Sequence, residues 1–487
     1  MQRRTVSAER VRAGGWSAGN SSLVLWGIVF AGALLRLIAL GHKSFWLDET
    51  ASVRVARRAA PVFWHVLWHD EGNMALYYVL LKPWLHFGYA EGTVRLLSVI
   101  PGVLALPLMY LLGERLFGRR VGLLAATFLA LNPCAIAVAQ EARAYSFLVL
   151  AVVLSTYLFA LLIEEPGSAS ALAYAATTAL TCYFHYFGVL APVAHAVSIL
   201  ALPAKRRPWK LLFLAWVTSA LLASPILWLM HAQDVRHISW VQPPSLLEAY
   251  HLGVFLAANG GKAVGATLLA LDLALVALFL GNLKASWRVA EDDLHRWRYT
   301  LVASSFCSPV LITLLISIVR PVFYHRYLII CLPAWILMTS LGAVQGSTGA
   351  LRRWAFLSVC MLSLVCTFIS YRRVTEDWRG VANYLIANAG VSDRVLYYQP
   401  DGQFAGESYR DWLPAGNTSR PPAIGIDISN SDWEREIAHA GRVWLVLYRA
   451  RPNDAEARAI ERELSAQREA GTQKNFRGIM VIEYKPR

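Results

Sequence analysis

Charged residues are scarce in this chain, and their scarcity excludes most classes of soluble protein. Only 16% of the 487 residues are charged, whereas 56% are hydrophobic. The hydrophobic residues gather in long runs, and a run of about 20 apolar residues is enough to cross a bilayer. The composition therefore predicts a polytopic α-helical membrane protein rather than a soluble enzyme.

Cysteine is also rare, and its placement argues against a disulfide framework. All six cysteines lie in or at the edges of apolar runs, without the spacing of metal ligands: Cys134, Cys182, Cys307, Cys331, Cys360 and Cys366. We interpret them as small buried hydrophobic residues. The sequence also lacks an internal repeat and any low-complexity tract.

The positive net charge does not require a nucleic-acid partner. The formal charge is +14, but the basic residues cluster in short loops between apolar runs. Such loops are typical of the cytoplasmic side of a membrane protein. We therefore expect membrane lipids, and not nucleic acid, to surround this chain.

The apolar runs and the basic loops together predict a topology of about 11 transmembrane helices. The segment 74–87 is apolar but short, and Lys82-Pro83 interrupts it. If it crossed the membrane, every later basic loop would move outside, against the positive-inside rule. We therefore expect it to lie on the outer surface as an amphipathic helix. The expected spans are 22–41, 95–114, 121–139, 145–163, 170–183, 187–203, 211–230, 262–281, 299–319, 327–344 and 354–371.

This topology divides the chain into three parts. Residues 1–21 form a basic cytoplasmic tail, and residues 22–374 form the membrane domain, with 42–94 as its first outer loop. Residues 375–487 read as a soluble α/β domain on the outer side. In that domain we expect helices at about 377–388 and 454–468, strands at 394–398, 442–448 and 479–484, and a long loop over 401–430.

Two adjacent carboxylates, Asp48 and Glu49, follow the first apolar run and lie at the outer interface. Ionisable residues at a membrane are costly to keep and are candidates for function. The alternative interpretation is a solvated acidic pair at a helix exit. Several other polar groups share the outer compartment in this topology, which indicates chemistry at that face.

A series of short motifs resembles a known family. Trp46-Leu47-Asp48-Glu49 is similar to the Asp-Glu motif of the C-type (GT-C) membrane glycosyltransferases. The bacterial branch related to protein O-mannosyltransferases and lipid A aminoarabinose transferases (glycosyltransferase family 39/83-like) is the most similar. Met74-Ala75 departs from this pattern, where the family usually has Pro-Pro. Further matching motifs are Asn73 to Tyr78, Glu91 to Ser98, Leu112 to Gly118, Gln140 to Tyr145, His185 to Phe187, His325 to Leu328 and Asp377 to Arg379.

The resemblance implies transfer of a sugar from a polyprenyl-phosphate donor to a glycan, lipid (such as lipopolysaccharide) or protein acceptor. The site would face the periplasm from the bacterial cytoplasmic membrane. Polyprenyl phosphate is a good leaving group, so the reaction needs cations at the phosphate and a carboxylate at the acceptor hydroxyl. Asp48 is the candidate base, with Glu49 as the second candidate or as the residue that orients it.

Five outer residues are candidates for binding the donor phosphate: Arg143, Tyr145, His185, Tyr324 and Arg326. A guanidinium offers bidentate donors that match phosphate geometry. The alternative is that the arginines extend along helix ends to the interface and that His185 is a satisfied interfacial residue. No cofactor is required, and a divalent cation between Asp48 and Glu141 is optional.

Two other functions compete with this interpretation. A flippase or transporter of lipid-linked saccharides would carry polar residues inside its spans. Here the predicted span interiors are almost free of charge, with Asp272 and Arg36 as exceptions. An oligosaccharyltransferase or lipid-linked polymerase would share the chemistry but use a protein or polymer acceptor.

Overall fold

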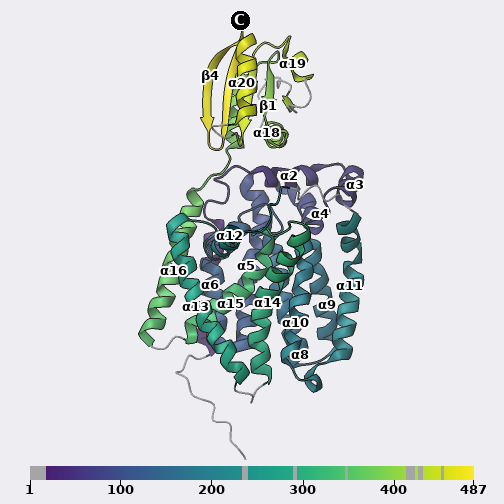
Figure 1. Cartoon of the computed structure of the whole chain (residues 1–487), viewed down its shortest axis with the longest axis vertical. Coiled ribbons are helices and arrows are strands. Elements are labelled where there is room, and N and C mark those ends of the chain that lie inside the picture. The colour runs from purple at the N-terminus through teal and green to yellow at the C-terminus, as the bar shows by residue number, and fades with distance from the viewer. Residues whose placement is uncertain are drawn as a thin grey trace, which may run out of the picture.

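The chain forms a bundle of helices with a small sheet domain at one end (Figure 1). The computed structural model describes residues 18–232, 240–288, 293–345, 349–412, 423–425, 432–450 and 454–487. Of the predicted cytoplasmic tail, residues 1–17 lie outside the described residues.

The bundle is built from α-helices joined by short turns and 3₁₀ segments. The α-helices are α1 (Ala18–Leu37), α2 (Leu47–Arg57), α3 (Ala60–His69), α4 (Ala75–Trp84), α5 (Glu91–Phe117), α6 (Arg119–Leu131), α7 (Pro133–Ala139), α8 (Tyr145–Glu164), α9 (Ser168–Phe184), α10 (Leu190–Ser198), α11 (Trp209–Ala232), α12 (Leu246–Ala258), α13 (Lys262–Arg288), α14 (Asp293–Val319), α15 (Leu332–Gln345) and α16 (Gly349–Arg372). The 3₁₀ segments are η1 (Leu85–Phe87), η2 (Tyr186–Val189), η3 (Ile199–Ala201), η4 (Ala204–Arg206) and η6 (Tyr327–Cys331).

The described residues contain seven helical segments long and apolar enough to cross a membrane. The count is eight if α6 and α7, which meet at a 58° bend, form one span. Three further apolar helical segments in the described residues are shorter, namely Ser21–Leu37, Tyr186–Ala201 and α12. The structure thus confirms a polytopic helical membrane protein, whereas the count of 11 spans stays a prediction.

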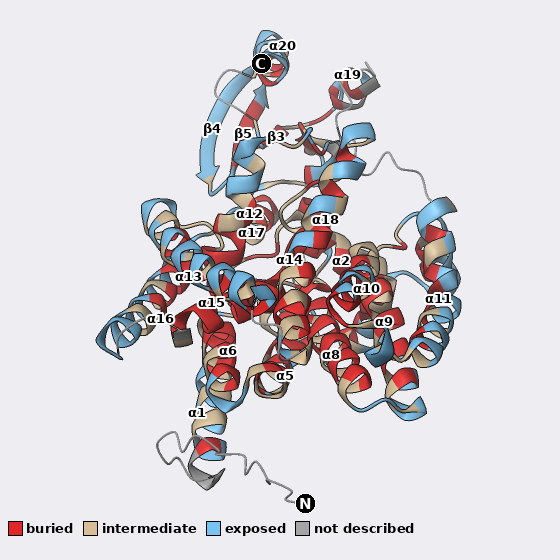
Figure 2. Ribbon diagram, turned by 60° about the horizontal axis from the view of Figure 1, so that its bottom comes forward, coloured by how far each residue is buried: buried red, intermediate tan, exposed pale blue. Residues whose placement is uncertain are grey.

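Burial separates central from peripheral spans (Figure 2). In the span Tyr327–Val344, 89% of the apolar window is buried inside the protein, against 28% in α11 and in α16. The peripheral helices therefore present apolar side chains outward, as a lipid-facing surface requires. The bundle core forms around η6, α15, α8 and α5.

The two charged residues expected inside spans are both bound by other helices. The buried Arg36 guanidinium donates to the carbonyl oxygens of Leu129 and Ala130 on α6 and of Gly32 on α1. Asp272 on α13 accepts a 3.0 Å hydrogen bond from Trp335 Nε1 on α15. These charges therefore join helices within the bundle.

The segment predicted as the first outer loop folds into α2, α3 and α4 beneath the sheet domain (Figure 1). The predicted short helix at 74–87 is present as α4 followed by η1, and α4 has only 10 residues. It is too short to span a bilayer. Its buried face carries Tyr77, Tyr78 and Leu81.

The sheet domain has five strands in the order β2-β1-β3-β5-β4. β1 pairs in parallel with β2 and β3, whereas β5 pairs antiparallel with β3 and β4. Its elements are α17 (Trp378–Asn388), β1 (Arg394–Tyr397), α18 (Pro400–Trp412), β2 (Ala423–Gly425), α19 (Asp432–Ile437), β3 (Val443–Tyr448), α20 (Ala455–Gln467), β4 (Arg468–Phe476) and β5 (Ile479–Pro486).

The three predicted strands and two predicted helices of this domain are present, but the long loop expected over 401–430 is partly wrong. Helix α18 occupies its first part. The many polar residues of this segment indicate a loop, but the helix has a buried face that includes Ala405 and Tyr409. β4 was also missed. Its burial pattern is almost entirely exposed, so it lacks the apolar alternation that marks a strand.

Candidate active site

Helix α2 carries the acidic pair at its first turn, where carboxylates are favoured by the helix dipole. Glu49 also accepts a 3.2 Å hydrogen bond from the backbone N–H of Trp46, just before the helix. The helix therefore begins where the sequence places Asp48 and Glu49, and its local structure presents the two side chains differently.

Glu49 is fully buried and is held by Arg95 of α5. Arg95 Nε lies 2.8 Å from Glu49 Oε1, and Arg95 Nη2 lies 2.7 Å from Oε2. The backbone N–H of Ala142 donates to Oε1 as well, at 2.8 Å. With both oxygens occupied, Glu49 positions α2 against α5 and the turn before α8. Of the two roles left open for Glu49, this geometry favours that of the orienting neighbour.

Asp48 is the accessible member of the pair. Its side chain is 38% exposed, and Oδ2 lies 3.8 Å from Arg143 Nη2. Arg143 also donates to the Asp48 backbone oxygen at 3.4 Å and to Ser52 Oγ at 3.3 Å. The Asp48 carboxylate thus retains lone pairs for a proton from solvent or substrate.

Arg143 lies in the turn between α7 and α8 with its guanidinium facing α2. Burial alone would lower its pKa, but the Asp48 carboxylate raises the pKa of Arg143 well above the ordinary value. The side chain is therefore a permanent cation next to Asp48. Its Nε is buried and has no hydrogen-bond partner among the described residues.

Arg326, just before η6, forms an ion pair with Glu141. Its guanidinium carbon lies 5.1 Å from the ring centres of both Trp46 and Tyr145, so two aromatic faces hold it. Burial opposes the charge, but Glu141 raises the pKa of Arg326 above its ordinary value. Arg326 is a second fixed cation, and Trp46 connects it to the start of α2.

The aromatic candidates and His185 lie in one chain of ring contacts that includes Tyr327. Tyr145 is buried at the start of α8, and its ring centre is 6.0 Å from that of His185. Tyr324 packs against Tyr327 at 5.1 Å, and Tyr327 lies 5.3 Å from His185. The structure therefore gathers all the predicted phosphate-binding residues around one region at the end of the bundle next to the sheet domain.

His185 differs from the arginines in its charge. Its Nδ1 accepts a 3.1 Å hydrogen bond from the backbone N–H of Phe187, and Nε2 is buried without a partner among the described residues. Burial, and then the nearby Arg143, lower the pKa of His185 well below its ordinary value. A neutral imidazole offers a hydrogen bond at this position but no positive charge.

Residues for which the sequence indicated no role complete the site. Arg95 binds Glu49, and the buried Glu376 accepts a 3.0 Å hydrogen bond from the backbone N–H of Leu47 at the start of α2. Arg95 could have been identified as a charge within an apolar helix, which needs a buried partner. Glu376 gives no comparable signal, because its partner lies more than 300 residues away.

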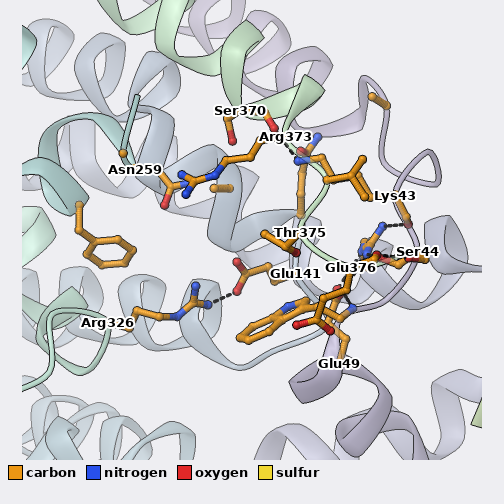
Figure 3. Close-up of a pocket in the computed structure, with 18 of the residues that line it drawn as sticks. Lys43, Ser44, Glu49, Glu141, Asn259, Arg326, Ser370, Arg373, Thr375 and Glu376 are labelled. Carbon is orange, nitrogen blue, oxygen red and sulfur yellow. Dashed lines mark hydrogen bonds and ion pairs between the residues drawn. The ribbon is translucent and has the colours of Figure 1, made fainter. Parts of the chain in front are cut away.

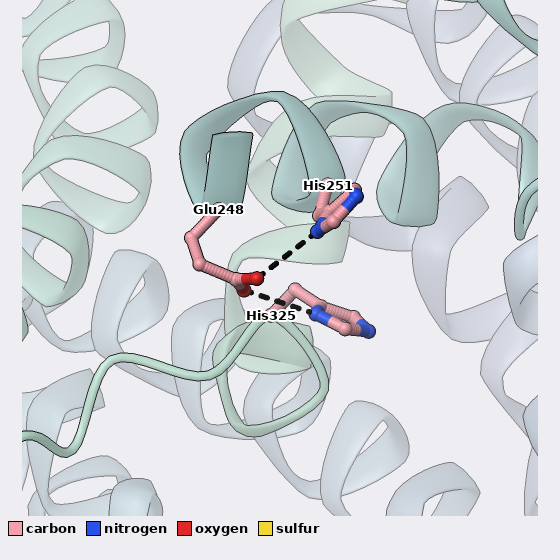
Figure 4. A group of neighbouring side chains, drawn as sticks. All are labelled: Glu248, His251 and His325. Atoms are coloured by element: carbon pink, nitrogen blue, oxygen red, sulfur yellow. Dashed lines mark hydrogen bonds and ion pairs between the residues drawn. The ribbon is translucent and has the colours of Figure 1, made fainter. Parts of the chain in front are cut away.

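One group in the described part of the chain could hold a metal ion: Glu248, His251 and His325 (Figure 4). His251 Nδ1 lies 3.0 Å from Glu248 Oε1, and His325 Nδ1 lies 3.6 Å from Oε2. Carboxylate and imidazole ligands suit Zn²⁺ and similar ions. The optional divalent cation between Asp48 and Glu141 stays a prediction, and each of these carboxylates faces an arginine.

Comparison with known proteins agrees with this architecture. Residues 84–231 match a family model described as dolichyl-phosphate-mannose-protein mannosyltransferase. The fold is similar to that of ArnT from Cupriavidus metallidurans bound to undecaprenyl phosphate, with a TM-score of 0.62 and 12% identity over 96% of this chain and 98% of ArnT.

A second similar structure is the archaeal oligosaccharyltransferase AglB from Archaeoglobus fulgidus, in complex with an inhibitory peptide and a dolichol-phosphate. The TM-score is 0.57, with 12% identity over 87% of this chain and 69% of AglB. No curated protein sequence matches the chain. The resemblance predicted from the motifs is therefore confirmed at the level of fold: this chain is a multi-pass membrane protein with the fold of the GT-C glycosyltransferases.

Proposed function

We propose that this chain is a glycosyltransferase that moves a sugar from a polyprenyl-phosphate donor to an acceptor hydroxyl on the outer face of the bacterial cytoplasmic membrane. The observation that carries the proposal is the exposed Asp48 carboxylate 3.8 Å from Arg143, with Arg326 held nearby by Glu141 and two aromatic rings. This arrangement offers one accessible base beside two permanent cations.

In the proposed reaction Asp48 accepts the proton of the acceptor hydroxyl as its oxygen attacks C1 of the donor sugar. The C1–O bond breaks, and its electron pair leaves on polyprenyl phosphate, whose negative charge grows by one. Arg143 and Arg326 stabilise that developing charge, because cations fixed in place before the reaction need no reorganisation. The acceptor, which we expect to be a glycan, a lipid or a protein, gains the sugar.

Two structures similar in fold are described with the same kind of carrier. ArnT was solved with undecaprenyl phosphate and AglB with dolichol-phosphate, and the matching family model is named for a dolichyl-phosphate sugar. These carriers support a polyprenyl-phosphate donor for this chain. Arg36 and Asp272, the charged residues inside the predicted spans, bind neighbouring helices. Because they hold helices together, they favour transfer over transport through the bundle.

The test is sugar transfer by the purified protein from synthetic polyprenyl-phosphate sugars. We expect turnover with such donors and none with nucleotide sugars. Asp48→Asn keeps the shape of the side chain but cannot accept the proton, so kcat should fall by about 100-fold or more. Asp70→Asn, a change at an exposed aspartate of the same outer region, is the matched control. Near-normal turnover by Asp48→Asn would exclude Asp48 as the base.

A further inference from the structure

A cavity of about 520 Å³ lies at the junction between the helix bundle and the sheet domain (Figure 3). Its walls come from the loop after α1, the end of α12, the turn around Arg326, the end of α16 and Arg449 of the sheet domain. Small-molecule sites fall in the range of roughly 300–1,000 Å³, so it has room for a polar headgroup. It shares Trp46, Glu141 and Arg326 with the site described above.

The acidic residues of this cavity are already neutralised by partners within the protein. Glu49 is paired with Arg95, and Glu141 is paired with Arg326. Glu376 accepts hydrogen bonds from Leu47 N–H, Trp378 Nε1 and Tyr448 Oη, and Arg449 Nη2 lies 3.6 Å from it. Each carboxylate of the lining therefore has an arginine partner in the described part of the chain.

Two cations of the lining remain without an acidic partner. Among the described residues, neither Lys43 nor Arg373 has a carboxylate within ion-pair distance. Three carboxylates therefore face five cationic side chains, namely Lys43, Arg95, Arg326, Arg373 and Arg449, and the excess of two positive charges belongs to Lys43 and Arg373.

The segments that carry the two unpaired cations meet at Ser370, and both side chains line the same cavity. Lys43 Nζ donates to the carbonyl oxygen of Ser370 at 2.6 Å, and the backbone N–H of Arg373 donates to the same oxygen at 3.1 Å. The Arg373 guanidinium packs against Gly260, where an added Cβ would lie 2.8 Å from Nη1. Figure 3 shows both side chains beside Ser370. The two positive charges line one cavity and repel each other, and an anion bound between them would remove that repulsion.

We propose that Lys43 and Arg373 bind a phosphate group of one of the two substrates, in addition to the donor phosphate held by Arg143 and Arg326. This inference deepens the proposed function and rests on it for the identity of the substrates. The group is either a phosphate on the acceptor or the second phosphate of a diphosphate-linked donor. Lysine supplies a point charge and arginine a planar fork, a combination suited to a phosphate.

The binding test uses inorganic phosphate and purified full-length protein in the Arg143→Ala background, which weakens the first phosphate site. Lys43→Gln and Arg373→Gln remove the charges, and a glutamine at position 43 can still donate to Ser370. We expect the double variant to bind phosphate at least about tenfold more weakly, because charge-assisted hydrogen bonds are lost. Arg372→Gln, at the exposed neighbouring arginine, should bind as the background does. Equal binding by the double variant and its background would overturn the proposal.

A kinetic test identifies which substrate carries the phosphate. In the otherwise unchanged protein, the double variant is compared with wild type on polyprenyl-monophosphate and polyprenyl-diphosphate sugars. A rise in KM for the diphosphate donor alone assigns the site to the donor. An unchanged KM for both donors, together with lost phosphate binding, assigns it to the acceptor. If wild type transfers sugar from neither donor, the proposed function fails, while the binding test still decides the site.

Discussion

Glu49 and Arg95 form a two-point ion pair that fixes α2, the helix of the candidate base, against α5. Both side chains are almost completely buried, at 1% and 5% exposed. Removing one partner of a buried pair leaves an uncompensated charge, at a cost of about 3–5 kcal/mol. We therefore expect Glu49→Ala to lower the free energy of unfolding by about that amount.

The measurement is thermal unfolding of the purified variant in detergent, with Asp48→Asn as the control. Asp48 is partly exposed and its loss leaves the Glu49–Arg95 pair intact, so the control should unfold near the wild-type temperature. An unchanged unfolding temperature for Glu49→Ala would show that the pair does not stabilise the fold.

Arg143 and Arg326 should each contribute to use of the donor. A charge-assisted hydrogen bond contributes about 1.5–3 kcal/mol, which corresponds to a loss of roughly ten- to a hundredfold in kcat/KM for each alanine variant. Lysine at either position should restore only part of this loss, because it lacks the bidentate fork. Transfer assays with varied donor concentration give the values, and Arg372→Ala serves as the control. Unchanged donor dependence in both alanine variants would refute their assignment.

The sequence predicted those features that depend on local pattern. The membrane class follows from the apolar runs, and the main strands of the sheet domain follow from their apolar alternation. The motifs around Asp48, Arg143 and Arg326 pointed to residues that the fold gathers at one end of the bundle. The different surroundings of Asp48 and Glu49 could not be predicted, because they depend on Arg95 and on the turn before α8.

The cavity beside the sheet domain could not be predicted from the sequence either. Lys43, Ser370 and Arg373 meet only when the end of α16 returns to the loop after α1, and nothing in their local sequence indicates that contact. Helix α18 could not be predicted for the same reason, since its buried face packs through Tyr409 on Phe45, just before α2. Tertiary contacts decide these features, and local propensity does not.

Removal of divalent cations should leave sugar transfer largely intact. The positive charge near Asp48 comes from Arg143 and Arg326, so the proposed reaction does not depend on a metal ion. We expect dialysis against a chelator to change kcat by less than about twofold, well below the effect expected from loss of the general base. Elemental analysis of His251→Ala, a change in the group that could hold a metal, reports separately on any ion bound there. Complete loss of turnover on chelation, restored by one metal, would contradict this expectation.

Phosphate binding at the proposed second site should weaken at high pH. The pKa of Lys43 is lowered to about 8. Burial is the largest cause and repulsion from Arg95 and Arg373 adds to it, whereas Glu141 and Glu49 partly oppose the decrease. Lys43 is therefore charged below pH 8 and loses its proton as the pH rises through that value. The affinity for inorganic phosphate in the Arg143→Ala background should fall between about pH 7 and pH 9.

Lys43→Arg provides the control for this pH dependence, because a guanidinium stays charged over the same range. We expect its phosphate affinity to be nearly constant between these pH values. The same decline in Lys43→Arg as in the background would assign the pH dependence to a group other than Lys43.

Glu376 should couple the sheet domain to the candidate base. It lies in the segment between α16 and α17, and its carboxylate binds the backbone N–H of Leu47, next to Asp48, together with Trp378 and Tyr448. Glu376→Ala would leave these buried donors without their acceptor, at a cost of about 1–3 kcal/mol. It would also release the start of α2, so we expect kcat to fall more than the donor KM rises.

Glu376→Gln separates the two effects, because an amide oxygen can still accept one of these hydrogen bonds. It should recover part of the lost kcat and part of the lost stability. Glu407→Ala, on the partly exposed face of α18, is the control for a lost carboxylate in the same domain. If Glu376→Ala unfolds at a lower temperature but keeps the wild-type kcat at temperatures where it is folded, the residue stabilises the domain contact without positioning Asp48.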